Sequence, residues 1–181
     1  MYGIVNKGIE DLVKAKFGEA KWESILSKSG VNIDFFIASE SYDDDITFKL
    51  AMAASAELDL SIERILIEFG EWWVLSTGQE KYSGLMKAGG NNLHSFLLNL
   101  PSFHDRIILI YPKLTPPEFR ITDADKSGLK LHYYSKRVGL QSFVIGLLSG
   151  LSKLFNTKIK VEVIASREWG NDHEIFKIEY A

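Results

Sequence analysis

Four histidines are the side chains in this sequence best suited to bind a metal or move a proton: His94, His104, His132 and His173. His132 falls in a strand-like pattern and His173 in a polar stretch, so both are expected at or near the surface. His104 is predicted to open a helix. It shares a face of that helix, at spacings of three, four and seven, with Ile107, Ile108 and Tyr111. This face would point the imidazole into an apolar layer, where it is either a buried structural histidine or a metal ligand.

A second polar group follows the pattern Tyr-x-Ser-x-Arg at Tyr133, Ser135 and Arg137. In an extended chain every second residue faces the same side, so two hydroxyls and a guanidinium would meet at one point. Such donors suit a pair of carboxylates, because arginine forms charge-assisted and often bidentate bonds. The alternative is an exposed strand end with an incidental arginine.

The composition limits the classes of function. The chain has 181 residues, 46 % of them hydrophobic and 25 % charged, which predicts one globular domain. The formal net charge of -3, with no run of Lys or Arg, argues against nucleic acid as a partner. The lack of cysteine excludes disulfides, thiolate metal sites and iron-sulfur clusters. Neither a signal-like start nor a long apolar run is present, so we expect a cytoplasmic protein that does not enter a membrane.

The first hundred residues have the periodicity of helices. Helix starts are predicted at Asp43-Asp44-Asp45 and at Ser61, and a loop is predicted over residues 89–92. Two further helical stretches, 93–100 and 103–111, are expected on either side of Pro101. Three prolines would then end the helical region: Pro112, Pro116 and Pro117.

Alternation of apolar and polar residues predicts four antiparallel strands after Pro117, at 119–122, 129–133, 159–163 and 175–180. An apolar helix is expected between the second and third strands, over residues 138–155. The fold class that follows is α+β, with an N-terminal helical region followed by a small four-stranded antiparallel sheet on which a helix packs.

His104 and the Tyr133, Ser135 and Arg137 motif, in this order and on this plan, resemble the H-NOX family, the haem nitric oxide/oxygen binding domains. The resemblance runs from residues 1–6 (MYGIVN) through 69–73 (FGEWW) to the last strand. It implies one b-type haem held between helices and sheet. His104 would be the axial iron ligand, and the motif would bind the haem propionates. It also implies a helical subregion at about 1–60 and a haem-holding subregion at about 61–181.

Further roles follow from the same resemblance. Pro117 corresponds to a proline that presses on the haem and bends it, although it is also a plain loop stop. An acidic residue of the 43–45 run would pair with Arg137, with Asp44 as the first candidate. The haem and its gas pocket would be lined by Tyr2, Val5, Trp73, Phe143 and Leu147.

The identity of the gas depends on one position. Members of the family that hold oxygen stably carry a tyrosine donor where this chain has Ser142, so the resemblance implies nitric oxide, and also carbon monoxide, as ligands. The expected partner is a separate histidine kinase or diguanylate cyclase. We expect no enzyme activity, because the catalytic motifs of serine hydrolases, phosphate-binding loops and zinc proteases are absent. The alternative is an apolar small-molecule or lipid-binding module without haem, in which His104 is merely buried.

Overall fold

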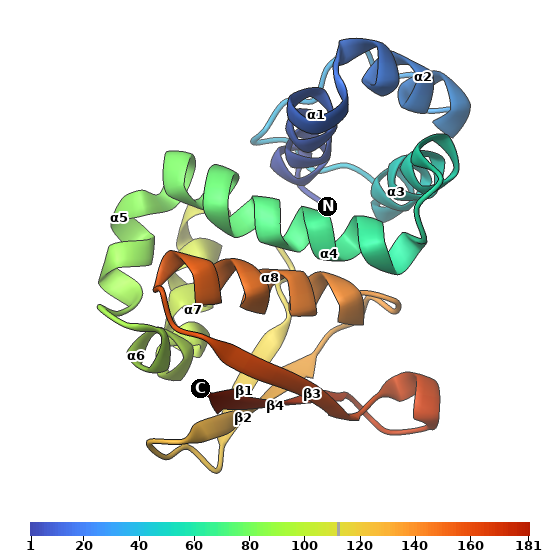
Figure 1. Cartoon of the computed structure of the whole chain (residues 1–181). Coiled ribbons are helices and arrows are strands. Elements are labelled where there is room, and N and C mark those ends of the chain that lie inside the picture. Colours follow the sequence, from blue (N-terminus) through green and yellow to red (C-terminus); the bar gives the residue numbers. More distant parts are fainter. Residues whose placement is uncertain (112) are drawn as a thin grey trace.

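The computed structural model describes residues 1–111 and 113–181, so the predicted helix stop at Pro112 lies outside the described residues. The fold begins with α1 (Gly3–Phe17), α2 (Glu19–Ser29) and α3 (Asp44–Leu58), which form one group of helices at the top of Figure 1. This confirms the predicted helical character of the first part of the chain.

The helical region continues through the middle of the chain. α4 (Ile62–Trp72) runs through a π-helix, η1 (Trp73–Gly78), into α5 (Gln79–Gly89), and α6 (Leu93–Leu98) and α7 (Leu100–Ile110) follow. Side-chain caps confirm both predicted helix starts. The Asp43 carboxylate accepts from the Asp45 amide at 3.0 Å, and the Ser61 hydroxyl oxygen accepts from the Arg64 amide at 3.2 Å.

The prediction for the start of α7 was wrong. Pro101 does not separate two helices but lies in the first turn of α7, which begins at Leu100. A proline is tolerated there because the first amides of a helix have no partner inside the helix. His104 therefore does not open a helix. It lies one turn inside α7, where its orientation is set by helical geometry rather than by a loop.

The four predicted strands are confirmed as β1 (Glu118–Thr122), β2 (Gly128–Tyr134), β3 (Ile159–Ala165) and β4 (Glu174–Tyr180). They form one antiparallel sheet in the order β1-β2-β4-β3, with the short 3-10 helix η2 (Arg167–Trp169) between β3 and β4. In this register Tyr133 of β2 lies opposite Phe119 of β1 and Glu174 of β4. The fold class is α+β, as predicted.

The apolar helix predicted between the second and third strands is α8 (Gln141–Leu154). Figure 1 shows α8 beside α4, with the sheet on one side and α1–α3 on the other. A Cβ atom added at Gly146 of α8 would lie 2.2 Å from the Ile67 carbonyl oxygen of α4, and one added at Gly70 of α4 would lie 2.3 Å from the Phe143 carbonyl oxygen. Glycine at these positions is what lets the two helices approach so closely.

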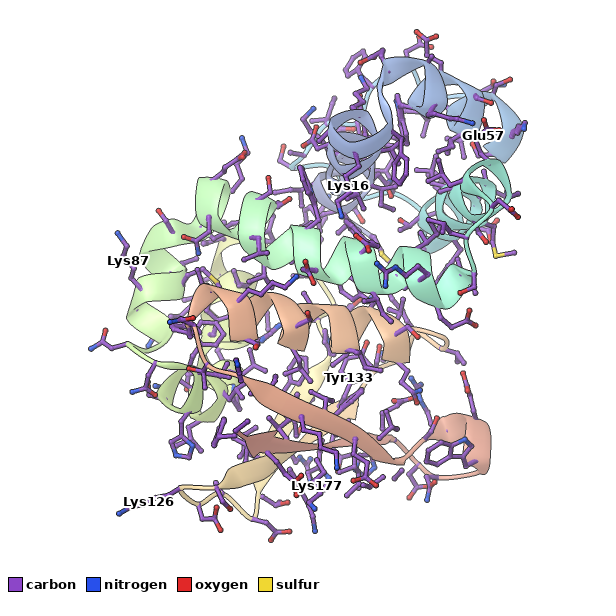
Figure 2. The ribbon with its side chains drawn as sticks, viewed as in Figure 1. Lys16, Glu57, Lys87, Lys126, Tyr133 and Lys177 are labelled. Carbon is purple, nitrogen blue, oxygen red and sulfur yellow. The ribbon has the colours of Figure 1, made fainter. Side chains whose placement is uncertain are left out.

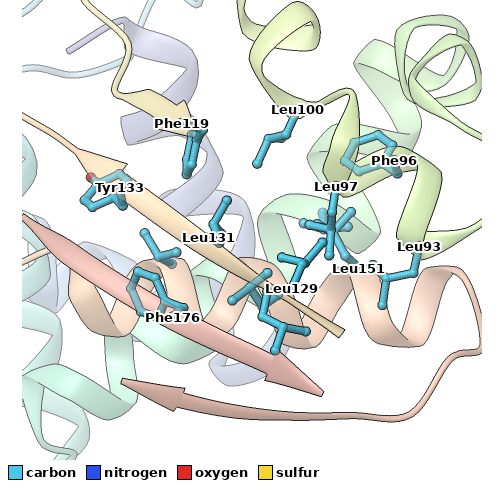
Figure 3. Close-up of a cluster of buried hydrophobic side chains, with 14 of the residues drawn as sticks. Leu93, Phe96, Leu97, Leu100, Phe119, Leu129, Leu131, Tyr133, Leu151 and Phe176 are labelled. Atoms are coloured by element: carbon cyan, nitrogen blue, oxygen red, sulfur yellow. The ribbon is translucent and has the colours of Figure 1, made fainter. Parts of the chain in front are cut away.

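The core is divided into two hydrophobic clusters. The sheet-side cluster joins the inner face of the sheet to α6, α7 and α8, and Figure 3 shows Phe119, Leu131, Tyr133 and Phe176 of the strands beside Leu97 and Leu100. The helix-side cluster joins α1–α4. Among the residues that the structure describes, no helix is both long enough and apolar enough to cross a membrane.

Candidate functional site

One cavity of about 280 Å³ lies between the two clusters and is lined mainly by apolar side chains. All the predicted site residues line it: Tyr2, Val5, Trp73, His104, Pro117, Tyr133, Ser135, Arg137, Phe143 and Leu147. They come from α1 and the residue before it, from η1, α7, β2 and α8, and from the connections before β1 and after β2. The structure therefore brings together residues that lie as much as 145 positions apart in the sequence, although their contact with a haem stays a prediction.

His104 has the geometry of a metal-binding imidazole. Its Nδ1 lies 3.0 Å from the carbonyl oxygen of Leu100, one turn earlier in α7. A carbonyl can only accept, so Nδ1 carries the proton and Nε2 keeps its lone pair. Within the described part of the chain Nε2 has no hydrogen-bond partner. Burial lowers the pKa of His104, and the Leu100 carbonyl only partly opposes this, so the imidazole is neutral at neutral pH.

Opposite walls of the cavity belong to different clusters. The His104 ring packs against Phe119 of β1, with ring centroids 4.9 Å apart, and so lies with the sheet-side cluster. Trp73 and Phe143 both pack against Phe69, with centroid distances of 5.9 and 5.2 Å, in the helix-side cluster. A flat group placed between the clusters would have the imidazole on one face and an apolar wall on the other.

The polar end of the cavity is built around Arg137. Its Nε donates to Asp44 Oδ2 at 2.7 Å, its Nη2 donates to Asp44 Oδ1 at 3.2 Å, and its Nη1 donates to the Thr115 carbonyl at 2.9 Å. Burial of Asp44 would by itself raise its pKa, but the hydrogen bonds and positive charge of Arg137 hold that pKa below its ordinary value. Asp44 is therefore the member of the acidic run that pairs with Arg137.

The motif itself departs from the extended form predicted for it. β2 ends at Tyr134, and residues 135–137 lie in a bend, where the Ser135 hydroxyl oxygen accepts from the Arg137 amide at 3.1 Å. Tyr133 points into the interior between α8 and the sheet, whereas the labelled lysines in Figure 2 lie on the outside. Burial raises the pKa of Tyr133, so its hydroxyl stays protonated as a donor. The three side chains still line one cavity.

Two residues considered from the sequence do not line the cavity. Ser142 is the second residue of α8, and its neighbour Phe143 faces the cavity instead. Ile108, predicted on the His104 face, is 36 % exposed, whereas Ile107 and Tyr111 do line the cavity. Around the helix axis, positions three and seven residues beyond His104 lie to one side of it and position four lies to the other, and the cavity lies on the first side.

A pair of tyrosines was not predicted as part of the site. The hydroxyls of Tyr82 on α5 and Tyr111 at the end of α7 lie 2.6 Å apart, and both residues line the cavity. Tyr82 has non-helical backbone angles, so α5 is kinked where it meets α7. The π-helix before it, which supplies Trp73, was not predicted either. Neither feature has a sequence signal, because both depend on contacts between helices.

The other histidines lie outside this cavity lining. His132 Nδ1 lies 2.9 Å from His173 Nε2 on the sheet, and His94 Nδ1 lies 3.1 Å from the Tyr180 hydroxyl. The structure thus separates His104 from the three histidines for which the sequence predicted no metal-binding role.

The donor set fits a haem. A neutral imidazole with a free Nε2 is a suitable axial ligand for ferrous iron. Arg137, Ser135 and Tyr133 place a guanidinium and two hydroxyls at one end of an otherwise apolar cavity, and these are the partners that two carboxylates require. A lipid without a carboxylate would offer no acceptor to these donors.

Comparison with known proteins points the same way. A family model described as haem-NO-binding matches residues 2–163. The chain is 26 % identical over 182 residues to soluble guanylate cyclase gcy-31 of Caenorhabditis elegans, and 30 % identical over 188 residues to gcy-37 of the same organism. Each match covers 99 % of this chain, but the chain spans only about a quarter of the length of these curated relatives.

Solved structures share the fold over the whole chain. An H-NOX protein from S. oneidensis in the Fe(II)NO ligation state matches with a TM-score of 0.90 at 21 % identity, covering 100 % of this chain and 99 % of that one. The Fe(II) unliganded H-NOX protein from K. algicida matches with a TM-score of 0.88 at 24 % identity, covering 100 % and 97 %. At such low identity these likenesses show the fold.

Proposed function

Because this chain belongs to the haem-NO-binding family, whose members are haem-based gas-sensing domains, we propose that it binds one haem b in the central cavity and senses nitric oxide there. The observation that carries this proposal is the neutral, partly buried His104 whose Nε2 is free, set across an apolar cavity from Trp73 and Phe143. When bound, the haem would supply an iron that can take a diatomic gas.

His104 would be the protein ligand of the iron. The Leu100 carbonyl fixes its tautomer and ring orientation, which is the usual role of a partner to the second nitrogen of a metal-binding histidine. The position one turn inside α7 makes the imidazole a rigid extension of that helix. A pull on His104 would therefore act on α7 as a whole.

Arg137, Ser135 and Tyr133 would bind the two propionates. Asp44 and Thr115 accept hydrogen bonds from the Arg137 guanidinium. These bonds fix the direction of the side chain but do not use all of its N–H donors. The two partners of this ion pair lie on different parts of the fold, since Asp44 begins α3 and Arg137 follows β2. This end of the cavity therefore couples the N-terminal helices to the sheet.

The apolar wall opposite His104 would favour nitric oxide over oxygen. Bound oxygen carries partial negative charge and needs a hydrogen-bond donor, whereas bound nitric oxide is nearly neutral. Val5, Phe143 and Leu147 offer no donor, so the preference for nitric oxide requires that the indole N–H of Trp73 does not reach the bound gas. Ser142, at the position where oxygen-binding relatives carry tyrosine, does not line the cavity. Carbon monoxide, which also needs no donor, is expected to bind.

The output would be a change in shape read by a separate partner, a histidine kinase or a diguanylate cyclase. His104 would hold the iron from within α7, so a change in that contact when the gas binds would act on α7. Pro117 lines the same cavity and would press on the haem in the resting state. The gas then favours one of two shapes through its different affinity for each.

The visible spectrum of the purified protein tests this proposal. We expect a Soret band, a five-coordinate ferrous spectrum that persists in air, and a large spectral change with nitric oxide. His104→Gly should yield mainly haem-free protein that takes up haem again when free imidazole is added.

His94→Gly is the matched control, because it removes a histidine that does not line the cavity and should leave the spectrum unchanged. A normal ferrous spectrum in His104→Gly would overturn the assignment of the ligand, and a stable oxygen complex in the wild type would overturn the choice of gas. A wild-type protein that takes up no haem but binds fatty acids would favour the lipid-binding alternative.

A further inference from the structure

We propose that Arg167 and Glu174 form a brace that positions residues 135–137 for the carboxylates of the cofactor. The inference rests on the proposed function, and it assigns a role to two residues that do not line the cavity. Arg167 lies in η2, in the connection between β3 and β4, and Glu174 is the first residue of β4, so both are far in sequence from the motif that they would hold.

The contacts of Arg167 show how the brace works. Its Nη1 donates to the Ser135 carbonyl at 2.7 Å and its Nη2 donates to the Arg137 carbonyl at 2.8 Å. Its Nε donates to Glu174 Oε1 at 2.8 Å. One planar guanidinium thus holds the main chain on both sides of Lys136, and all three of its nitrogens are used.

The brace is needed because the sheet no longer holds this segment. The strand pairing of β2 ends at Tyr134, so the carbonyls of Ser135 and Arg137 have no partner in a β-ladder. The Arg137 side chain is fixed at its far end by Asp44 and Thr115, and its backbone is fixed by Arg167. Arg137 is therefore held at both ends, and its guanidinium can keep one direction.

Glu174 ties the brace to the sheet. It is the first residue of β4 and lies opposite Tyr133, the first residue of the motif, in the register of the sheet. Its side chain is 4 % exposed, and that of Arg167 is 19 % exposed. The segment that carries Arg167 is itself fixed, because buried Ser166 accepts from the Glu168 amide at 3.2 Å and donates its own amide to Asn171 Oδ1 at 3.3 Å.

A charge pair at this depth calls for a role beyond stability. Burying both charges costs desolvation free energy that their attraction largely cancels, so an apolar pair of similar size would stabilise the fold as well. An apolar pair could not donate two hydrogen bonds to main-chain carbonyls. The ion pair therefore determines the positions of Ser135 and Arg137, which an apolar pair would leave free.

Arg167→Lys tests the brace while keeping the positive charge beside Glu174. A lysine ammonium is a compact point charge and cannot span two carbonyls and a carboxylate as the guanidinium does. We expect haem to leave the ferric variant about tenfold faster than the wild type, measured by transfer to excess apomyoglobin. In the haem-free chain, the amides of residues 135–137 should exchange with deuterium faster.

Arg120→Lys is the matched control, because Arg120 forms an ion pair with Glu118 on the same sheet but is 62 % exposed. It should leave both measurements unchanged. Glu174→Gln, which keeps the shape of the side chain but removes its charge, is a second variant should Arg167→Lys fold poorly, and it should also speed haem loss.

An Arg137→Ala background separates positioning from general stability. If Arg167 acts by placing Arg137, then adding Arg167→Lys to Arg137→Ala should change the rate of haem loss by less than about threefold, because the two effects are not independent. Independent, multiplying effects would overturn the brace, as would an unchanged rate in both the Arg167→Lys and Glu174→Gln variants. A wild type that takes up no haem would instead overturn the proposed function itself.

Discussion

The close contact between α4 and α8 predicts that Gly146→Ala destabilises the fold. The added Cβ would lie 2.2 Å from the Ile67 carbonyl oxygen and 2.9 Å from the Ile67 Cα, where ordinary contacts begin at 3.4 Å. These atoms belong to the backbone of α4, so no side-chain rotation can make room. The two helices must separate by about 1 Å, and this disturbs the packing along the whole contact between them.

The magnitude follows from two opposing terms. Alanine gains about 1 kcal/mol over glycine in a helix interior. An overpacked core loses typically ~1–3 kcal/mol and occasionally more, and a backbone-to-backbone clash belongs at the upper end. We therefore expect Gly146→Ala to lower the free energy of unfolding by about 2 kcal/mol net.

Gly84→Ala is the control, since Gly84 is an exposed position in helix α5 with no heavy atom within 4 Å of the added Cβ. Only the helix-propensity term applies there, so this substitution should stabilise the protein by ~0.5–1 kcal/mol. Urea unfolding of the haem-free variants, followed by circular dichroism, measures both values. A Gly146→Ala protein as stable as the wild type would refute the argument from close helix contact.

The function of the site should respond as well. Phe143 and Leu147 lie close to Gly146 on α8 and form the cavity wall that α8 supplies. Separation of α8 from α4 should widen that wall, and the rate of carbon monoxide binding to the ferrous protein should differ from the wild-type rate for Gly146→Ala but not for Gly84→Ala.

Three further predictions concern individual contacts. Asp44→Asn should lower the free energy of unfolding by about 1 kcal/mol at neutral pH, a value that allows for solvent screening of the pair with Arg137, in which the Asp44 side chain is 38 % exposed. Because the pKa of Asp44 is lowered in the folded state, this stabilisation exists above the unfolded pKa and is lost as pH falls, so the difference seen in urea unfolding should vanish well below about pH 4. Thr47→Val removes the donor that lies 2.6 Å from Asn6 Oδ1 in the core, so urea unfolding should show a loss of about 1–3 kcal/mol, whereas Thr47→Ser should lose less. Pro117→Ala should flatten the bound haem and shift the unliganded protein toward its signalling shape; an equally bent haem in its crystal structure, with unchanged regulation of the partner, would leave His104 as the switch.

The local features of the fold could be predicted because they depend on neighbouring residues. Alternation of apolar and polar residues places the strands, since side chains in a strand face opposite sides in turn. The caps Asp43 and Ser61 mark helix starts, because their side chains bond amides two or three residues ahead. His104 and the Tyr133, Ser135 and Arg137 motif are recognisable in the same way, by residue type and spacing.

Which of the three aspartates at 43–45 pairs with Arg137 could not be predicted from neighbouring residues. Asp43 is used as the cap of α3, and Asp45 lies 2.9 Å from Lys49 Nζ, one turn ahead on the same helix. Only Asp44 then points toward Arg137, 93 positions away. The sequence offers three carboxylates of equal chemistry, and the direction of each is set by the rotation of α3 against the rest of the fold.

The sequence by itself determined the four strands, the starts of α3 and α4, the metal-binding candidate His104 and the donors at the polar end of the cavity. The tertiary structure alone decided that α7 begins before Pro101, that residues 135–137 bend away from the sheet, and that Arg167 and Glu174 hold them there. It also decided that glycines bring α4 and α8 into contact. The physical reason is that periodicity and capping act within a few residues, whereas these features depend on backbone atoms and charges brought together from distant parts of the chain.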